Sequence, residues 1–104
     1  MKINIDTITR ASKELIGNII RTPTIRSQHL SSEINAEVFL KLENLQYTSS
    51  FKVRGAYISI TRLKEEQKKM GVIAMSAGNH AQAVAWWAKK ERVNATIVMP
   101  EHAP

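Results

Sequence analysis

Two short apolar runs with a helical pattern between them constrain the fold of this chain more than any other feature. Residues 72–75 are Val-Ile-Ala-Met, and residues 95–99 are Ala-Thr-Ile-Val-Met. The continuous apolar run at residues 72–75 is typical of a strand covered on both faces, and residues 95–99 predict a further strand that Pro100 ends. Residues 80–90 carry apolar side chains at helical spacing, at Ala81, Val84, Ala85 and Ala88. Because parallel strands are joined by crossover helices, this order predicts an α/β fold with parallel strands and flanking helices.

The preceding part of the chain predicts two more helices and one more strand. We expect a first helix with Asp6 as its N-cap, ended by Thr-Pro at residues 22–23 and followed by a loop. Residues 38–42 predict a strand, and residues 51–69 predict a helix with Gly71 as its C-cap. The expected buried face of that helix contains Val53, Ala56, Tyr57 and Ile60. The chain ends soon after its last predicted strand, so we expect a piece of a larger fold.

The composition excludes several classes of protein. Cysteine is absent, which excludes disulfides and thiolate metal sites. No apolar run approaches the roughly 18 residues that span a bilayer, and the first residues lack the apolar core of a signal peptide. We therefore expect a cytoplasmic protein with no membrane partner.

The formal net charge of +6 raises the question of an anionic partner. The basic residues at positions 64, 68 and 69 share their segment with Glu65 and Glu66, a pattern typical of a solvated helix end. No basic run is interleaved with aromatic residues, and no nucleic-acid-binding motif is present. We therefore expect no nucleic-acid partner.

Lys52 lies where a polar loop meets the start of a predicted helix. The amide dipoles at a helix N-terminus oppose a positive charge, and Arg54 is close in sequence. If Lys52 is also shielded from water, both effects favour the neutral amine that attacks a carbonyl group. From the pattern alone, a surface lysine at a helix start is the simpler interpretation.

Residues 76–80, Ser-Ala-Gly-Asn-His, follow a predicted strand and open a predicted helix. Ligands collect at the carboxyl ends of parallel strands, and free amides at a helix start bind carboxylates and phosphates. Gly78 lets a ligand approach the backbone closely. From the pattern alone, Asn79 is also compatible with simple helix capping and His80 with a structural role.

The two segments together resemble one family of enzymes. Residues 48–56, Thr-Ser-Ser-Phe-Lys-Val-Arg-Gly-Ala, resemble the lysine motif of type II pyridoxal-phosphate enzymes, in particular threonine/serine dehydratases. Residues 76–80 are similar to the substrate-carboxylate loop of that family. Arg-Thr-Pro at residues 21–23 and Val-Met-Pro-Glu at residues 98–101 also fit. The resemblance covers nearly the whole chain, with both motifs in the expected order and spacing.

The resemblance implies a partial type II fold, similar to the β subunit of tryptophan synthase. Residues 1–67 would form the N-terminal part of the large cofactor-binding domain, and residues 68–104 the start of the small domain. The rest of both domains would be missing. The glycine-rich phosphate loop of the family would lie beyond this chain, so we expect the chain alone to be inactive. The full-length form would be a homo-oligomer.

The resemblance also assigns roles to single residues. Lys52 would hold pyridoxal phosphate covalently and then remove the α-proton of the substrate. Phe51 would lie against the cofactor ring, and Asn79 would hydrogen-bond its hydroxyl group. The substrate carboxylate would be surrounded by Ser76, Ala77, Gly78, Asn79 and His80. The implied activity is conversion of L-threonine or L-serine to a 2-oxo acid and ammonia, with a place in isoleucine biosynthesis; no metal is implied.

Two departures from the family pattern are informative. Ala77 stands where serine racemases often have a serine that moves a proton, which favours a dehydratase over a racemase. Ser49 stands where the family usually has glycine, and a positive φ there would cost roughly 1 kcal/mol or more. A serine racemase-like enzyme and a non-catalytic product of a truncated gene stay open as alternatives.

Overall fold

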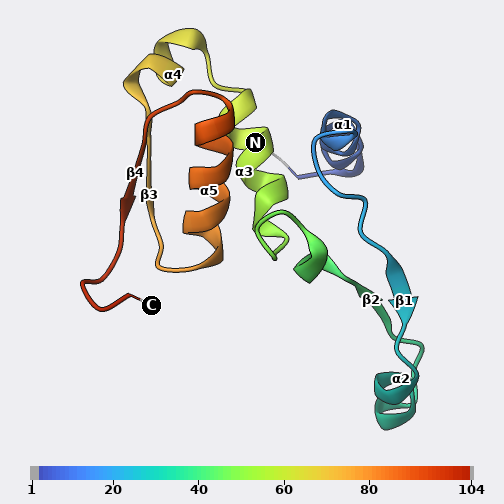
Figure 1. The fold of residues 1–104 in the computed structure, drawn as a ribbon. Coiled ribbons are helices and arrows are strands. Elements are labelled where there is room, and N and C mark those ends of the chain that lie inside the picture. Colours follow the sequence, from blue (N-terminus) through green and yellow to red (C-terminus); the bar gives the residue numbers. More distant parts are fainter. Residues whose placement is uncertain (1–2, 104) are drawn as a thin grey trace.

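Helices and two small sheets alternate along the chain, and the computed structural model describes residues 3–103 (Figure 1). The elements in order are α1 (Ile5–Leu15), β1 (Thr24–Arg26), α2 (Gln28–Ile34), β2 (Phe39–Lys41), the 3-10 helix η1 (Glu43–Leu45), α3 (Lys52–Thr61), α4 (Glu65–Met70), β3 (Val72–Met75), α5 (Asn79–Lys90) and β4 (Ala95–Val98).

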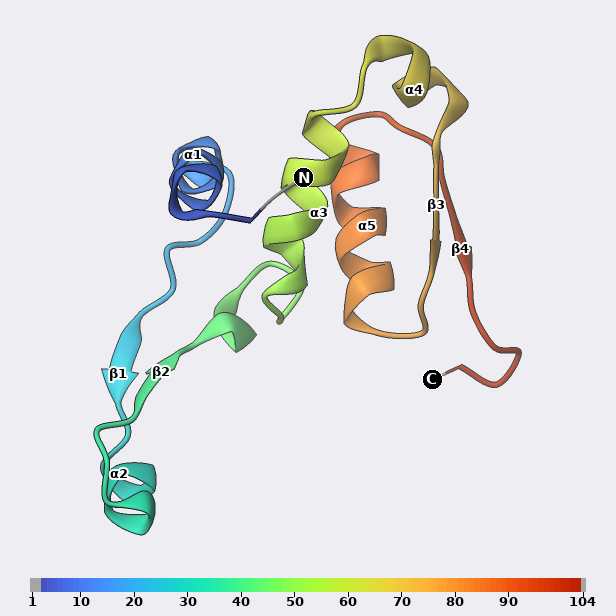
Figure 2. The same cartoon turned by 180° about the vertical axis from the view of Figure 1, so that it is seen from behind.

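The strand–helix–strand unit at the C-terminal end confirms the predicted parallel pair. β3 and β4 pair in parallel, with Val72 opposite Ala95 and Met75 opposite Val98. α5 joins them and packs on one face of this sheet, as both views of the ribbon show (Figures 1 and 2). The predicted α/β class is therefore correct.

The core lies where α3 packs against α5. The two helices run side by side in the same direction, so their N-termini lie at the same end of the molecule (Figures 1 and 2). The indole Nε1 of Trp87 donates a buried hydrogen bond of 2.8 Å to the carbonyl oxygen of Val53, which ties the two helices together. The buried apolar residues of this core are Val53, Ala56, Ile60, Ala83, Val84, Trp87, Ala88 and Val93. The predicted apolar face of α3 is confirmed, with Tyr57 partly buried beside the core.

The predicted helix over residues 51–69 is two helices, α3 and α4. The break follows from local hydrogen bonding: the side chain of Gln67 accepts a bond of 2.9 Å from the backbone N–H of Lys64 and starts a new helix there. Glu65 and Glu66 then occupy the first turn of α4, where acidic side chains are favoured. The predicted cap at Gly71 is confirmed.

The N-terminal helix also differs from the prediction. Its N-cap is Asn4, whose side chain accepts from the backbone N–H of Thr7 at 2.9 Å, while the Thr7 hydroxyl accepts from Asn4. This capping box satisfies two backbone donors at once, and Asp6 therefore lies inside the first turn. The helix ends at Leu15, well before residues 22–23.

The segment expected to be a loop after residue 23 contains β1 and α2. β1 pairs with β2 in antiparallel register, Thr24 opposite Lys41. This two-stranded sheet and α2 extend away from the α3–α5 core (Figure 1). The sheet is separate from β3 and β4, but α3 belongs to the same core as α5. The division into domains at residues 67 and 68 stays a prediction.

Only one face of the β3–β4 sheet is covered by described residues. Ile73 is 74% exposed and Met75 is 82% exposed, while Val72 and Ala74 pack toward the core. The expectation that β3 is covered on both faces was therefore wrong for this chain, because within residues 3–103 the helix that packs closely on β3 is α5, on one face. No described helix is long and apolar enough to cross a membrane.

We predict that Gly71→Ala lowers the free energy of unfolding by roughly 2–3 kcal/mol. Gly71 has φ 86° and ψ −176°, a region essentially confined to glycine, and an added Cβ would lie 2.7 Å from the carbonyl oxygen of Asn94. Gly17→Ala is the control, because Gly17 has φ 78° but no atom within 4 Å of an added Cβ. We expect it to cost only about 1 kcal/mol in urea unfolding. Equal losses in both variants would contradict the steric argument.

Candidate active site

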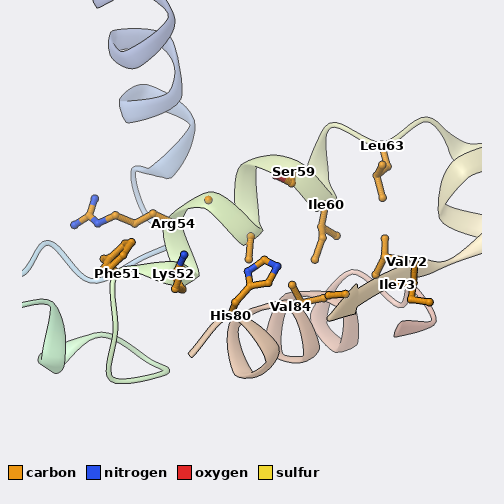
Figure 3. A pocket seen from close by; sticks show the side chains of 13 residues that line it. Phe51, Lys52, Arg54, Ser59, Ile60, Leu63, Val72, Ile73, His80 and Val84 are labelled. Carbon is orange, nitrogen blue, oxygen red and sulfur yellow. The ribbon is translucent and has the colours of Figure 1, made fainter. Parts of the chain in front are cut away.

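Lys52 and the start of α5 meet at one cavity. Lys52 is the first residue of α3, His80 is the second residue of α5, and both line a cavity of about 600 Å³ together with Phe51 (Figure 3). This volume lies within the range of small-molecule sites, roughly 300–1,000 Å³. The remaining lining residues come from α3, the segment between α3 and α4, β3 and α5: Arg54, Gly55, Ala56, Ser59, Ile60, Leu63, Val72, Ile73, Ala74 and Val84.

The Lys52 side chain is exposed and lies near an aromatic ring. Its Nζ is 5.2 Å from the centroid of the Phe51 ring. No acidic residue lies in the first turn of α3, and no side chain caps it. Shielding from water, which the sequence argument required, is therefore not provided by the described residues. Arg54, the expected second cation near Lys52, is paired with Glu43, which offsets its charge.

Residues 76–80 connect β3 to α5, as predicted. The backbone N–H of Ser76 continues the strand ladder to Val98 at 3.0 Å, and the Ser76 hydroxyl accepts from the N–H of Gly78 at 3.2 Å. Gly78 occupies the N-cap of α5, and no side chain caps this helix. Asn79 is therefore the first residue of α5 and does not cap it. The first amides of α5 remain available to an anion, which helix N-termini favour.

The structure brings only part of the predicted site into contact with the cavity. Phe51, Lys52 and His80 line it, while the predicted carboxylate-loop residues Ser76, Ala77, Gly78 and Asn79 do not. Their roles toward a cofactor or substrate stay predictions.

Glu43 is the centre of a polar network that was not predicted from the sequence. Its two carboxylate oxygens accept from Arg54 Nε and Nη2, each at 2.8 Å. The hydroxyl of buried Thr22 also donates to Glu43, and Lys41 Nζ lies 4.0 Å from it. The network joins η1, α3 and the residues before β1. Glu43 and Arg54 are eleven positions apart and lie in different elements, η1 and α3, so no periodic pattern in the sequence predicts their pairing.

The loop between η1 and α3 is anchored on two sides by its own side chains. The Gln46 side chain accepts from the N–H of Ile20 at 3.2 Å and donates to its carbonyl oxygen at 2.6 Å. The Tyr47 ring stacks on Trp86 of α5 with centroids 5.5 Å apart, and Lys90 Nζ lies 5.1 Å from the Trp86 ring. The segment that carries Lys52 is therefore attached both to the chain before β1 and to α5.

We predict that Ser49→Gly raises the free energy of unfolding by about 1 kcal/mol. Ser49 has φ 53°, which confirms the left-handed backbone that the family glycine suggested. The Ser49 side chain is exposed and makes no hydrogen bond within the described part of the chain, so glycine would lose none. Urea unfolding of both proteins measures the difference, and a loss of stability in the glycine variant would contradict the strain argument.

We also predict that Glu43 makes stability depend on pH in acid. The hydrogen bond from Arg54, aided by Thr22 and opposed by desolvation, lowers the Glu43 pKa from 4.5 to about 2. Because this pKa is depressed in the folded state, the stabilisation is present above pH 4.5 and is lost as the pH falls toward 2. Urea unfolding across this pH window should show a flatter dependence for Glu43→Gln than for the unmodified chain. An unchanged slope would contradict the prediction.

The geometry defines an α/β protein with a lysine and an uncapped helix start near one cavity, and comparison with known proteins gives the family. Residues 15–104 match the family of pyridoxal-phosphate dependent enzymes, and the chain belongs to it. This confirms the resemblance found in residues 48–56 and 76–80, together with the predicted fold class and cofactor.

Particular relatives refine the comparison. The chain is 52% identical over 103 residues to the catabolic L-threonine dehydratase TdcB of Staphylococcus aureus, covering 98% of this chain and 30% of that protein. Its structure is similar to maize serine racemase, with a TM-score of 0.88 and 38% identity, over 100% of this chain and 32% of that one. Threonine deaminase isoform 2 of Solanum lycopersicum matches with a TM-score of 0.76 and 33% identity, over 98% of this chain and 31% of that one. The chain thus spans about 30% of the length of the curated relative.

Proposed function

We propose that this chain carries the cofactor-binding lysine of an ammonia-lyase that converts L-threonine or L-serine to a 2-oxo acid and ammonia. The observation that carries the proposal is the single cavity lined by Lys52 at the start of α3 and His80 at the start of the adjacent, parallel α5. The 52% identity to a protein named L-threonine dehydratase supports the substrate class.

The residues present fit pyridoxal phosphate in the chemistry of their donor groups. An exposed primary amine, an aromatic ring beside it and an uncapped helix N-terminus match an aldehyde, a planar ring and an anionic group. When bound, pyridoxal phosphate acts as an electron sink that makes the substrate α-proton acidic.

The residues of the chain would then act as follows. Lys52 would hold the cofactor through its Nζ and accept the α-proton at the same atom. The Phe51 ring would lie against the cofactor ring, and Asn79 would hydrogen-bond the ring hydroxyl. The backbone amides of Ala77, Asn79 and His80 would hold the substrate carboxylate, because the N-terminus of α5 lacks a side-chain cap and an acidic first turn. Ser76 and Gly78 would lie beside it, since their own N–H groups already donate to Val98 and to the Ser76 hydroxyl. In the net reaction the substrate would lose its α-proton and its β-hydroxyl group as one water molecule. A second water molecule would then hydrolyse the resulting C=N bond and give the 2-oxo acid and ammonia.

Serine racemisation is the second candidate, favoured by the TM-score of 0.88 with maize serine racemase. Two observations favour the dehydratase. The identity to the threonine dehydratase is higher, 52% against 38%. The methyl group of Ala77 has no acidic proton to transfer, so this position offers no second acid or base.

Isoleucine biosynthesis is not supported, since the relative is named catabolic. Assembly into a homo-oligomer stays a prediction.

Covalent trapping tests the proposal directly. The chain is mixed with pyridoxal phosphate, reduced with borohydride, digested and mapped by mass spectrometry. We expect the label on Lys52, and we expect Lys52→Ala to abolish it. Lys69→Ala is the matched control, since Lys69 is an exposed lysine of α4 away from the cavity, and it should leave the label unchanged. A label predominantly on another lysine would overturn the proposal.

We predict that the 104-residue chain binds the cofactor weakly and has negligible turnover. Its four glycines, Gly17, Gly55, Gly71 and Gly78, are too far apart to form a glycine-rich phosphate loop. An absorbance titration with pyridoxal phosphate measures binding, and assays with L-threonine and L-serine measure 2-oxo acid and D-serine in parallel. Sustained 2-oxo acid production would contradict this prediction, while D-serine would favour the racemase.

A further inference from the structure

We propose that Glu43 is a positioning residue for Lys52, acting through Arg54. The two-pronged Glu43–Arg54 pair would fix the rotation of the first turn of α3 and thereby direct the Lys52 amine into the cavity that it shares with His80. This inference rests on the proposed function of Lys52 and adds a residue outside the lysine motif to the same site.

The Glu43–Arg54 pair has a geometry that fixes the direction of the Arg54 side chain. Arg54 Nε and Nη2 each donate to one oxygen of Glu43 at 2.8 Å, and such fork-like pairing constrains the guanidinium plane as well as its distance. Only 15% of the Glu43 side chain and 29% of the Arg54 side chain are exposed, which makes it the least exposed ion pair among residues 3–103. The Thr22 hydroxyl holds the carboxylate from another side.

Helix geometry connects this pair to Lys52. Successive helix residues are about 100° apart, so Lys52 and Arg54 leave α3 on nearly opposite sides. Figure 3 shows the Arg54 side chain extending away from His80, while Lys52 lies between Phe51 and His80. Val53, between them in sequence, is fully buried against α5. Val53 on one side and Arg54 on the other therefore set the direction in which Lys52 points.

Among residues 3–103, the other restraints on this turn are the burial of Val53 and the bond from Trp87 Nε1 to its carbonyl oxygen. Both act on the side of the helix that faces α5, whereas the Glu43–Arg54 pair acts on another side. Phe51, the N-cap of α3, provides no side-chain hydrogen bond, and Lys52 N–H reaches the Ser50 hydroxyl only at 3.4 Å. The backbone bonds nearby are local turns, from Ser49 to Gln46 and from Arg54 to Phe51. The first N–H groups of α3 therefore have no strong side-chain partner, and the ion pair of Arg54 is the polar contact that fixes the side chains of this turn.

A purely structural role for Glu43 is the alternative, and the chain contains a matched pair that separates the two. Arg62, at the other end of α3, donates to both oxygens of Glu14 at 2.7 and 3.0 Å. This pair also ties α3 to another segment, α1, but it lies two to three turns from Lys52 and does not line the cavity. Glu14→Gln therefore removes a similar interaction from the same helix without touching the first turn.

The experiment measures the rate of borohydride trapping of pyridoxal phosphate at Lys52, divided by the rate at exposed Lys69 and Lys89 in the same sample. We expect Glu43→Gln to lower this ratio by roughly tenfold, since small misplacements of a reacting group have large effects on rate. Glu14→Gln should leave it within about twofold, as expected for a more exposed pair. Thr22→Val keeps the ion pair but removes one hydrogen bond to Glu43, and should give an intermediate ratio.

Each outcome decides between the two roles. Circular dichroism identifies a variant that does not fold, and Thr22→Val then decides in place of Glu43→Gln. The inference is overturned if Glu43→Gln leaves the ratio within about twofold, or if Glu14→Gln lowers it equally. If Lys52 of the unmodified chain reacts no faster than Lys69, the proposed function itself fails, and this inference fails with it. The inference is confirmed if Lys52 is trapped faster than Lys69 and Lys89, and if this preference falls in Glu43→Gln but not in Glu14→Gln.

Discussion

The parallel packing of α3 against α5 determines where every candidate residue of this site lies. Small side chains, Ala56 on α3 and Ala83 on α5, allow the two backbones to approach, and the buried bond from Trp87 to the Val53 carbonyl oxygen ties them together. Because both helices begin at the same end, the partial positive charges of two N-termini meet at one place. Neither first turn holds an acidic residue, so this end of the helix pair would favour an anionic group.

The elements that the sequence predicted are those whose information is local. β3, α5 and β4 were correct because continuous apolar runs and helical spacing are visible within a few residues. Gly71 was correct as a cap because few residues other than glycine adopt its φ of 86°. β1 and α2 were missed since a three-residue strand and a seven-residue helix are too short for a periodic pattern. The break between α3 and α4 depends on one side chain, Gln67, within an otherwise helical segment.

The candidate site divides in the same way. Phe51, Lys52 and His80 were predicted from motif residues that stand close together in sequence, and they line one cavity, whereas Ser76, Ala77, Gly78 and Asn79 do not line it. The Glu43–Arg54 pair and the Tyr47–Trp86 stack could not be found, because each joins segments that only the folded chain brings together. The predicted environment of Lys52 was wrong on two points, because Arg54 is paired with Glu43 and the Lys52 side chain is exposed. Both depend on segments that are distant in sequence, so neither could be predicted from the residues around Lys52.

Trp86 and Trp87 are adjacent in sequence but lie in different surroundings, so the chain has two distinct fluorophores. Trp87 is buried and bonded to the backbone one residue after Lys52, so its emission follows the integrity of the helix pair. Trp86 stacks on Tyr47 in the loop that leads to Lys52, so its emission follows that loop. Replacing either tryptophan by phenylalanine would leave the other as a spectroscopic reporter, one for unfolding and one for movement near the cavity.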